Sequence, residues 1–296
     1  PLGGERVSVA DVRATLERFG LAAHRARGQN FLVDPHLAAK LVARAGVGPG
    51  ETVLEIGTGL GILTRALAAR AARVVSVEID AGLVRAVHAE GGLPAHVELH
   101  HADALELDLA ALLPGGGPAR VVASLPYAVA SPLLRRLLDL RARVEGFGVL
   151  LQAEVANRLK AGPGSRDYGS LAVLHQLTVK VGRGLPVSPR CFHPVPRVLS
   201  TFLTLTPLRE PLLAPGELPE VENLVRAAFR HRRKTVANSL RAALPRLQGE
   251  VLERVLHEQG IDPRARAESL APRELLGLAR SLRDAGSAPD ALRAPP

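Results

Sequence analysis

Short apolar runs alternate with amphipathic segments along most of the chain, a pattern typical of a parallel sheet covered by helices. The pattern is clearest over residues 53–80. An apolar run at 53–56 predicts a strand buried on both faces, and a glycine-rich turn follows it. Leu63 and Leu67 then keep helical spacing before a second apolar run at 73–77. This central unit therefore predicts strand, turn, helix and strand.

The same patterns extend to both ends of the chain. They predict further strands at 96–101, 120–123, 146–151 and 198–205, and helices at 8–19, 35–45 and 152–159. Beyond a proline-punctuated linker that starts at 207, helical periodicity runs from 221 to 244, and shorter helices are expected up to 283. The fold class is therefore α/β: a Rossmann-like domain with an N-terminal helical extension over 1–206, followed by a small all-helical domain over 207–296.

The turn of the central unit carries glycine at alternate positions, Gly57, Gly59 and Gly61. Glycine permits positive φ and lets a ligand approach the backbone. A dinucleotide fingerprint would need its third glycine at Ile62, so that pattern fails. The arrangement E-x-G-x-G-x-G, followed by Glu78 about twenty residues later, is similar to the S-adenosylmethionine motif of Rossmann-type methyltransferases, with Glu78 accepting hydrogen bonds from the ribose. A turn that only packs helix on strand, or a nicotinamide site, stays an alternative.

Composition narrows the possible partners. Apolar residues make up 47% of the 296 positions and mean hydropathy is +0.12, so a sizeable core is expected, while no apolar run is long enough for a membrane span. A single cysteine, Cys191, excludes an internal disulfide and fits a cytoplasmic location. The net charge of +9 and the pI near 10.8 favour a polyanionic partner such as nucleic acid, although a generally Arg-rich composition would also produce them.

The tetrapeptide Ser124-Leu125-Pro126-Tyr127 follows the strand at 120–123 and resembles the Asn/Asp-Pro-Pro-Tyr motif of amino-methyltransferases. An exocyclic adenine amine is a poor nucleophile because its lone pair is delocalised into the ring. A side-chain oxygen at the first position and the carbonyl of the second residue can accept its two hydrogens and aim the lone pair, while the tyrosine ring stacks on the base. The sequence thus predicts these four residues as the catalytic set.

Other polar positions are less specific. Gln29 and Asn30 precede a predicted helix and could hold a polar ligand or simply cap the chain. Asp103 follows the strand at 96–101, where ligand contacts collect in an open α/β sheet. His100 and His101 are adjacent in that strand and point to opposite faces, so no metal site is expected there.

At this stage the resemblance to one family becomes specific. The chain resembles the ribosomal RNA adenine N6-dimethyltransferases of the bacterial small-subunit type, from about residue 10 to 284. The blocks that carry the resemblance occur in family order: GQNFL, EIGTGLG, VEID, ADAL, SLPY, QAEVANRL, YGSL, FHPVPRV, FRHRRKTVANSL and IDPRARAESL.

The resemblance implies an S-adenosylmethionine cofactor and a small-subunit (16S) ribosomal RNA substrate in an immature small ribosomal subunit. It implies two adjacent N6,N6-dimethyladenosines near the 3′ end as the product, and a monomer without a membrane partner or metal. The matched cofactor-binding positions are Gln29, Asn30, Leu32, Gly57, Gly59, Glu78, Asp103 and Ser124. The matched RNA-binding positions are Arg230, Arg232, Arg233 and Lys234.

Three positions depart from the family pattern. Thr58 stands where proline is usual, Ala153 replaces a lysine, and Ser124 replaces the amine-holding asparagine. A hydroxyl still accepts a hydrogen bond, but it has a shorter reach and lacks the fixed geometry of an amide. Two alternatives therefore stay open: a large-subunit RNA methyltransferase of the macrolide-resistance type, and a catalytically weak RNA-binding assembly factor.

Overall fold

The computed structural model describes residues 9–21, 29–245 and 247–285. Within them the chain divides into two compact units. The first is built from residues up to 156 together with 181–207, and the second from 157–180 together with the residues from 208 onward. The sequence predicts a domain boundary at 206/207. The compact units differ from that prediction because the segment 157–180, expected in the first domain, belongs to the second unit. In the described parts of the chain no helix is both long and apolar enough to cross a bilayer.

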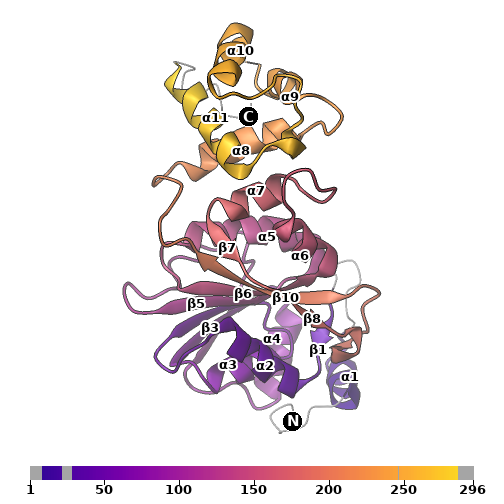
Figure 1. Ribbon diagram of the computed structural model, residues 1–296. Coiled ribbons are helices and arrows are strands. Elements are labelled where there is room, and N and C mark those ends of the chain that lie inside the picture. Colours follow the sequence, from indigo (N-terminus) through magenta and orange to yellow (C-terminus); the bar gives the residue numbers. More distant parts are fainter. Residues whose placement is uncertain (1–8, 22–28, 246, 286–296) are drawn as a thin grey trace. The chain divides into compact units, whose positions relative to one another are not determined.

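A mixed β-sheet forms the centre of the first unit (Figure 1). Its strands are β2 (Thr52–Ile56), β3 (Arg73–Glu78), β4 (Val97–His101), β5 (Ala119–Ser124), β6 (Gly146–Gln152), β8 (Leu185–Val187) and β10 (Ser200–Pro207). One further strand of this sheet, β7 (Val179–Val181), contributes only Val181 to the first unit. The order is β4-β3-β2-β5-β6-β10-β7, with β8 also paired to β10. Strands β2 to β6 pair in parallel, whereas β10 runs antiparallel to β6 and β8.

The central strands form because their side chains are buried on both faces. Val53, Leu54, Val74, Val75 and Val121 are all completely buried, as expected for parallel strands under helices. From β2 the chain adds β3 and then β4 toward one edge of the sheet. It then crosses back to add β5 on the other side of β2, so the direction of strand addition reverses between β2 and β5. A crevice opens beyond the carboxyl ends of strands at such a switch point, and the fold therefore places a ligand site there.

Helices cover both faces of this sheet (Figure 1). Helices α2 (Pro35–Ala45), α3 (Ile62–Ala68) and α4 (Ala81–Ala89) lie on one face, and α5 (Ala130–Leu137) lies on the other. Helix α2 begins at Asp34, whose carboxylate accepts the Leu37 N–H, and ends at Gly46 in the left-handed conformation. The first unit also contains α1 (Val9–Arg18) and most of the chain's strands, and α6 (Ala153–Lys160) begins in it.

One small sheet in the first unit was not anticipated from the sequence. Strand β1 (Phe31–Leu32) pairs antiparallel with β9 (Phe192–His193). Two-residue strands leave no periodic signal, and their partners are about 160 positions apart in the chain. In α5, Ser131 lies within the first turn, and Val129 occupies the N-cap position without a side-chain cap.

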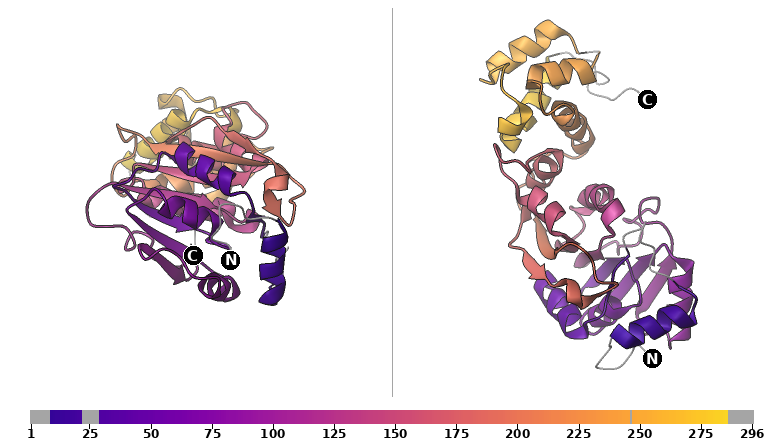
Figure 2. Two further views of the ribbon diagram at one scale, coloured as in Figure 1. Left: turned by 90° about the horizontal axis from the view of Figure 1, so that it is seen from below. Right: turned by 90° about the vertical axis from the view of Figure 1, so that its right-hand side faces the viewer.

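The second unit is helical in its described part (Figure 2). It contains α7 (Ser170–Gln176), α8 (Leu218–Phe229), α9 (Val236–Ala243), α10 (Gly249–Glu258) and α11 (Pro272–Asp284). The prediction of continuous helical structure from 221 to 244 is wrong, because α8 ends at Phe229 and α9 begins at Val236. The cations of 230–234 occupy the connection, and the Thr235 hydroxyl caps α9 by accepting the Asn238 N–H at 3.3 Å.

The segment 157–180 joins the second unit through Tyr168. This side chain is 2% exposed, and its ring meets Phe229 edge-on with centroids 5.7 Å apart. Its hydroxyl donates to the Leu270 carbonyl at 2.9 Å. A buried aromatic ring with a satisfied hydroxyl is a strong local anchor, which accounts for the assignment of this segment to the helical unit.

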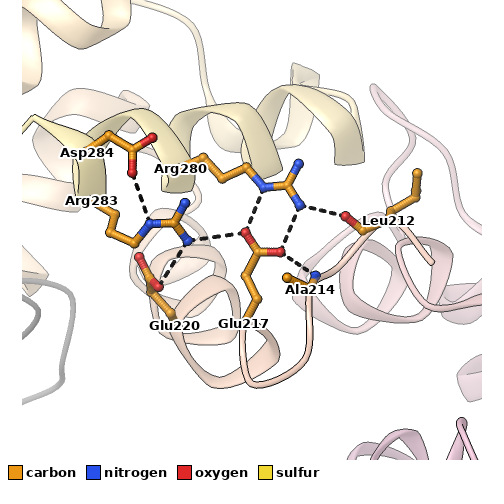
Figure 3. A network of polar contacts seen from close by, with 7 residues as sticks. All are labelled: Leu212, Ala214, Glu217, Glu220, Arg280, Arg283 and Asp284. Atoms are coloured by element: carbon orange, nitrogen blue, oxygen red, sulfur yellow. Dashed lines mark hydrogen bonds and ion pairs between the residues drawn. The ribbon is translucent and has the colours of Figure 1, made fainter.

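The start of α8 is fixed to α11 by a buried carboxylate, Glu217, which is only 6% exposed (Figure 3). Arg280 donates to both carboxylate oxygens, at 2.7 and 2.8 Å, and Arg283 approaches at 3.4 Å. The Ala214 N–H donates at 2.8 Å. The hydrogen bonds from Arg280 lower the pKa of Glu217 to about 2, against an opposing effect of burial.

Replacing Glu217 by Gln is therefore expected to destabilise the protein at pH 7 by about 1–3 kcal/mol, because Arg280 loses its charged partner. A carboxyl whose pKa is lower in the folded than in the unfolded protein stabilises the folded state at pH values above its unfolded pKa. That contribution should disappear from the wild type as the pH falls from about 4.5 to about 2. Urea unfolding of both proteins should thus show that the difference in their free energies of unfolding becomes smaller as the pH falls through this range.

The matched control is Arg254→Gln, which breaks an exposed pair with Glu258 on one face of α10. It should change stability by less than about 1 kcal/mol. Equal effects of the two substitutions at pH 7 would contradict a stabilising role for the Glu217 network.

Candidate cofactor and methyl-transfer site

A cavity of about 370 Å³ opens at the carboxyl ends of the parallel strands in the first unit. Its walls include the glycine turn after β2, Glu78 at the end of β3, Asp103 after β4 and Ser124 at the end of β5. The volume lies in the range of small-molecule sites. The cavity therefore occupies the switch point that the strand order creates.

The glycine turn needs its glycines. Gly57 has φ of 90°, and a Cβ placed there would lie 2.8 Å from the Ser124 carbonyl oxygen. Gly59 has φ of 56°, and a Cβ there would meet the Phe31 ring at 3.3 Å. Any side chain at Gly57 would push apart the ends of β2 and β5, so glycine keeps the turn and the predicted catalytic segment in contact.

Glu78 holds this turn in place. Its two carboxylate oxygens accept the Gly59 N–H at 2.9 Å and the Asp80 N–H at 3.0 Å. The side chain is 6% exposed, and burial raises its pKa while the two N–H groups oppose that rise. Each oxygen keeps a second lone pair, so Glu78 can accept further hydrogen bonds in the cavity.

A second carboxyl, Glu55, lies fully buried behind the turn. Ser76 Oγ donates to its Oε2 at 2.6 Å, and Ser76 Oγ is in turn 2.5 Å from Thr58 Oγ1. Burial raises the pKa of Glu55 to about 7, against the hydrogen bond from Ser76, and the nearby Glu78 charge adds to the rise. Thr58 lines the cavity, so the chain of hydroxyls connects this carboxyl to the site.

The segment after β5 presents acceptors to the cavity. Ser124, Leu125 and Pro126 all line it. The Pro126 carbonyl accepts the Val129 N–H at 3.2 Å in a short 3₁₀ turn, and the Leu125 N–H donates to the Leu150 carbonyl at 3.2 Å. Within the described residues, neither the Ser124 hydroxyl nor the Leu125 carbonyl takes part in a hydrogen bond. Both oxygens therefore keep their capacity to accept a hydrogen bond from a ligand.

The structure brings nearly all predicted site residues of the first unit together. The cavity is lined by all eight predicted cofactor positions and by three of the four predicted catalytic ones: Gln29, Asn30, Leu32, Gly57, Gly59, Glu78, Asp103, Ser124, Leu125 and Pro126. The Tyr127 side chain lies outside what the structure describes, so its role stays a prediction. Asp103 lines the cavity, and one of its carboxylate oxygens accepts the Leu105 N–H at 2.7 Å.

Sequence reasoning did not identify Phe31, Phe192 and Ser200 as cavity residues. Phe31 and Phe192 reach the site because β1 pairs with β9, and Ser200 reaches it as the first residue of β10. No spacing links these residues in the sequence. The FHPVPRV block was the signal that could have drawn attention to Phe192.

The predicted RNA-binding cations lie in the second unit, on the connection between α8 and α9. Arg230, Arg232, Arg233 and Lys234 are all exposed. Arg232 has internal partners, since it donates to the Arg166 carbonyl at 2.7 Å and pairs with Glu268 at 3.4 Å.

Comparison with known proteins decides the family. The model of the ribosomal RNA adenine dimethylase family matches residues 20–284. The chain belongs to this family. Among curated relatives, a ribosomal RNA small subunit methyltransferase A from Geobacter metallireducens is 42% identical over 265 residues, which cover 89% of this chain and 96% of that protein. One from Geobacillus kaustophilus is 38% identical over 273 residues, 90% of this chain and 93% of that protein.

Solved structures agree with this assignment. A dimethyladenosine transferase from Plasmodium falciparum has a TM-score of 0.70 at 25% identity, covering 86% of this chain and 98% of that one. The 23S rRNA methyltransferase ErmE has a TM-score of 0.61 at 29% identity, covering 86% and 99%. These neighbours confirm the predicted fold class, a Rossmann-like methyltransferase domain with an all-helical second part.

Members of the ribosomal RNA adenine dimethylase family use S-adenosylmethionine as methyl donor. The cavity fits that group: Gly57 and Gly59 leave room for a close approach to the backbone, and Glu78 offers carboxylate lone pairs suited to ribose hydroxyls. The cofactor and enzyme class expected from the sequence are thereby confirmed, whereas the individual residue contacts stay predictions.

We expect Glu78→Ala to weaken binding of S-adenosylmethionine by about 1–3 kcal/mol, because the cavity loses its ribose acceptor and the Gly59 N–H loses its partner. Isothermal titration calorimetry measures this directly. S-adenosylhomocysteine carries the same ribose, so its binding to Glu78→Ala should be weakened by a similar amount. Glu106→Ala, an exposed carboxyl that does not line the cavity, is the matched control. Unchanged affinity in Glu78→Ala would remove Glu78 from the ribose site.

Proposed function

We propose that this protein dimethylates the N6 amines of two adjacent adenosines near the 3′ end of small-subunit (16S) ribosomal RNA. It acts in the cytoplasm as a monomer on immature small ribosomal subunits. The observation that carries the proposal is a pair of acceptors in cavity-lining residues, Ser124 Oγ and the Leu125 carbonyl, which have no hydrogen-bond partner among the described residues.

These acceptors can offset the weak nucleophilicity of the adenine amine, whose lone pair is delocalised into the ring. The two hydrogens of an adenine N6 amine can be held by Ser124 Oγ and the Leu125 carbonyl, which turns the nitrogen lone pair toward the cavity. The cofactor, when bound, supplies a methyl group on a sulfonium, a good leaving group that needs no metal or protein nucleophile. The amine gains the methyl and releases one proton to water, and the freed lone pair is available for a second transfer.

The glycine turn contributes positioning. Gly57 packs so closely against the Ser124 carbonyl that the cofactor-binding turn and the amine-holding segment form one rigid wall. Methyl transfer depends on alignment of donor and acceptor, and a rigid wall supplies that alignment before the substrate binds.

The small subunit is favoured over the large one by the relatives. Curated relatives at about 40% identity are small-subunit methyltransferases, while the similarity to the 23S rRNA methyltransferase ErmE is 29%. A strain that lacks this protein tests the proposal. Mapping modified nucleosides in its ribosomal RNA should show loss of two adjacent dimethyladenosines in small-subunit RNA only. Loss of a large-subunit modification instead would support the macrolide-resistance type.

We further propose that the cations of the α8–α9 connection bind ribosomal RNA phosphates. Arg233→Gln with Lys234→Gln should weaken binding of small-subunit RNA and flatten its salt dependence by about 0.7–0.9 log units per lost contact. These two residues have no ion pair within the described part of the second unit, so we expect the double variant to keep its fold. Filter binding at several salt concentrations measures the slope.

Arg232 is excluded from this variant because its bonds to Arg166 and Glu268 would confound the result. The matched control is Arg254→Gln on α10, which removes one exposed cation outside the cluster. An unaltered salt slope in the double variant would identify the cluster as a solvated surface without an RNA contact.

A further inference from the structure

Large exposed apolar side chains lie in the cavity wall and in a loop whose two ends reach that wall. Among the described residues these are Val195 (61% exposed), Leu199 (63%), Val198 (44%) and Ile79 (49%). Ile79 itself lines the cavity, and the other three belong to a loop that leaves the cavity wall at Phe192 and returns to it at 200. Clustered exposed apolar surface marks an interaction site more often than scattered apolar residues do.

This loop is fixed at both ends, so its apolar side chains are presented outward by a firm backbone. At its start, His193 pairs with Phe31 in the β1–β9 sheet. At its end, the Leu199 carbonyl accepts the Ala153 N–H at 2.8 Å, and the next residue enters β10 opposite Gln152. Pro196, in the middle, is buried. A surface held in this way binds a partner without a large cost of ordering.

Charge indicates the kind of partner. Arg197 lies between Val195 and Val198 in the sequence and is exposed, and Arg190 is exposed on the short 3₁₀ turn before β9. In the described part of the first unit neither guanidinium has an ion-pair partner. Apolar side chains flanked by unpaired cations suit a nucleic acid strand, whose bases offer apolar faces and whose phosphates are negative.

We propose that Val195, Val198 and Leu199 form an apolar platform that packs against the unpaired bases flanking the target adenosine. The inference rests on the proposed function, because it assigns the RNA strand of that same reaction to this rim. Drawing an adenine into the cavity unstacks its neighbours and exposes their faces. Apolar side chains at the mouth replace that lost stacking, as inserted apolar residues do in other nucleic-acid complexes.

The test uses the full-length protein and a short small-subunit RNA fragment with 2-aminopurine next to the target adenosine. This base brightens when it leaves a stack of bases. Wild-type protein should bind the fragment and raise the fluorescence. The variant Val195→Ser with Val198→Ser and Leu199→Ser should bind about tenfold more weakly or worse and give a smaller rise at saturation.

Two further proteins define the controls. Val195→Leu with Val198→Leu and Leu199→Met keeps the surface apolar and should behave as the wild type. Arg197→Gln should flatten the salt dependence of binding while retaining the fluorescence rise. Calorimetry should find the affinity for S-adenosylmethionine unchanged in the triple serine variant, which shows that its cavity is intact.

Three other results would assign the surface formed by Val195, Val198 and Leu199 differently or overturn the proposed function. Unchanged RNA affinity and fluorescence in the triple serine variant, with an active wild type, would overturn the platform and leave the proposed function standing. A wild type that neither binds nor methylates small-subunit RNA would overturn the proposed function itself. Concentration-dependent dimers in sedimentation that the serine substitutions abolish, with RNA affinity unaffected, would assign the surface to a second copy of the chain.

Discussion

Ser124→Ala is expected to lower kcat for methyl transfer by about ten- to a hundredfold, equivalent to about 1–3 kcal/mol. The affinities for S-adenosylmethionine and for ribosomal RNA should stay nearly unchanged. The reason is that orientation of the amine matters mostly while the methyl transfers, so the lost interaction belongs to the transition state. Single-turnover kinetics with labelled cofactor and immature small subunits measure the effect separately from binding.

The matched variant is Ser124→Asn, which introduces the asparagine that the Asn/Asp-Pro-Pro-Tyr motif carries at this position. Ser124 is half-buried on the cavity wall, and its backbone is held against Gly57 and the end of β6. If the cavity accepts the longer amide, activity should be kept or raised. A Ser124→Ala protein with wild-type kcat would show that Ser124 Oγ does not hold the amine, and would leave the Leu125 carbonyl as the remaining acceptor.

The buried Glu55 should make stability fall with rising pH. Its pKa is raised by burial to about 7 in the folded protein, from about 4.5 when exposed. The folded state therefore keeps a proton that the unfolded state has lost. The stabilising contribution is complete below about pH 4.5 and disappears as the pH rises to about 7. At 1.36 kcal/mol per unit the loss is on the order of 3 kcal/mol.

Glu55→Gln removes the titration and keeps the side-chain shape. The free energy of unfolding of this variant, minus that of the wild type, should rise by about 2–3 kcal/mol between pH 5 and pH 8. Urea unfolding at several pH values measures the difference. Glu106→Gln, an exposed carboxyl of the first unit, is the control and should give a flat difference. A flat difference for Glu55→Gln would mean that Glu55 ionises normally in the folded protein.

The central unit was predictable because all of its determinants are local. The run at β2, the glycines of the turn and the acid at Glu78 lie within 28 residues, and the structure places Gly57, Gly59 and Glu78 on one cavity wall. Ser124 was found by its motif, and the parallel pairing of β5 with β2 brings it to Gly57. Alternating patterns and short motifs carry this kind of information well.

Features that depend on distant contacts were missed. The pairing of β1 with β9 joins segments far apart in sequence, and only that pairing brings Phe192 beside Phe31 at the cavity. The helical period from 221 to 244 continues through the break at Arg230, because periodicity records which side chains face the core and not whether the backbone turns. Tyr168 shows the same limit, since its partners Phe229 and Leu270 follow about 60 and 100 positions later.

With serine at position 124, we still expect this chain to be an active small-subunit RNA dimethyltransferase. The most direct test combines purified wild-type protein, labelled S-adenosylmethionine and immature small subunits from a strain that lacks the protein, with the product nucleosides identified by mass spectrometry. We expect N6,N6-dimethyladenosine at two adjacent positions near the 3′ end of the small-subunit RNA. No transfer by the wild type, with transfer gained in Ser124→Asn, would instead identify an RNA-binding assembly factor whose methyl-transfer site has decayed.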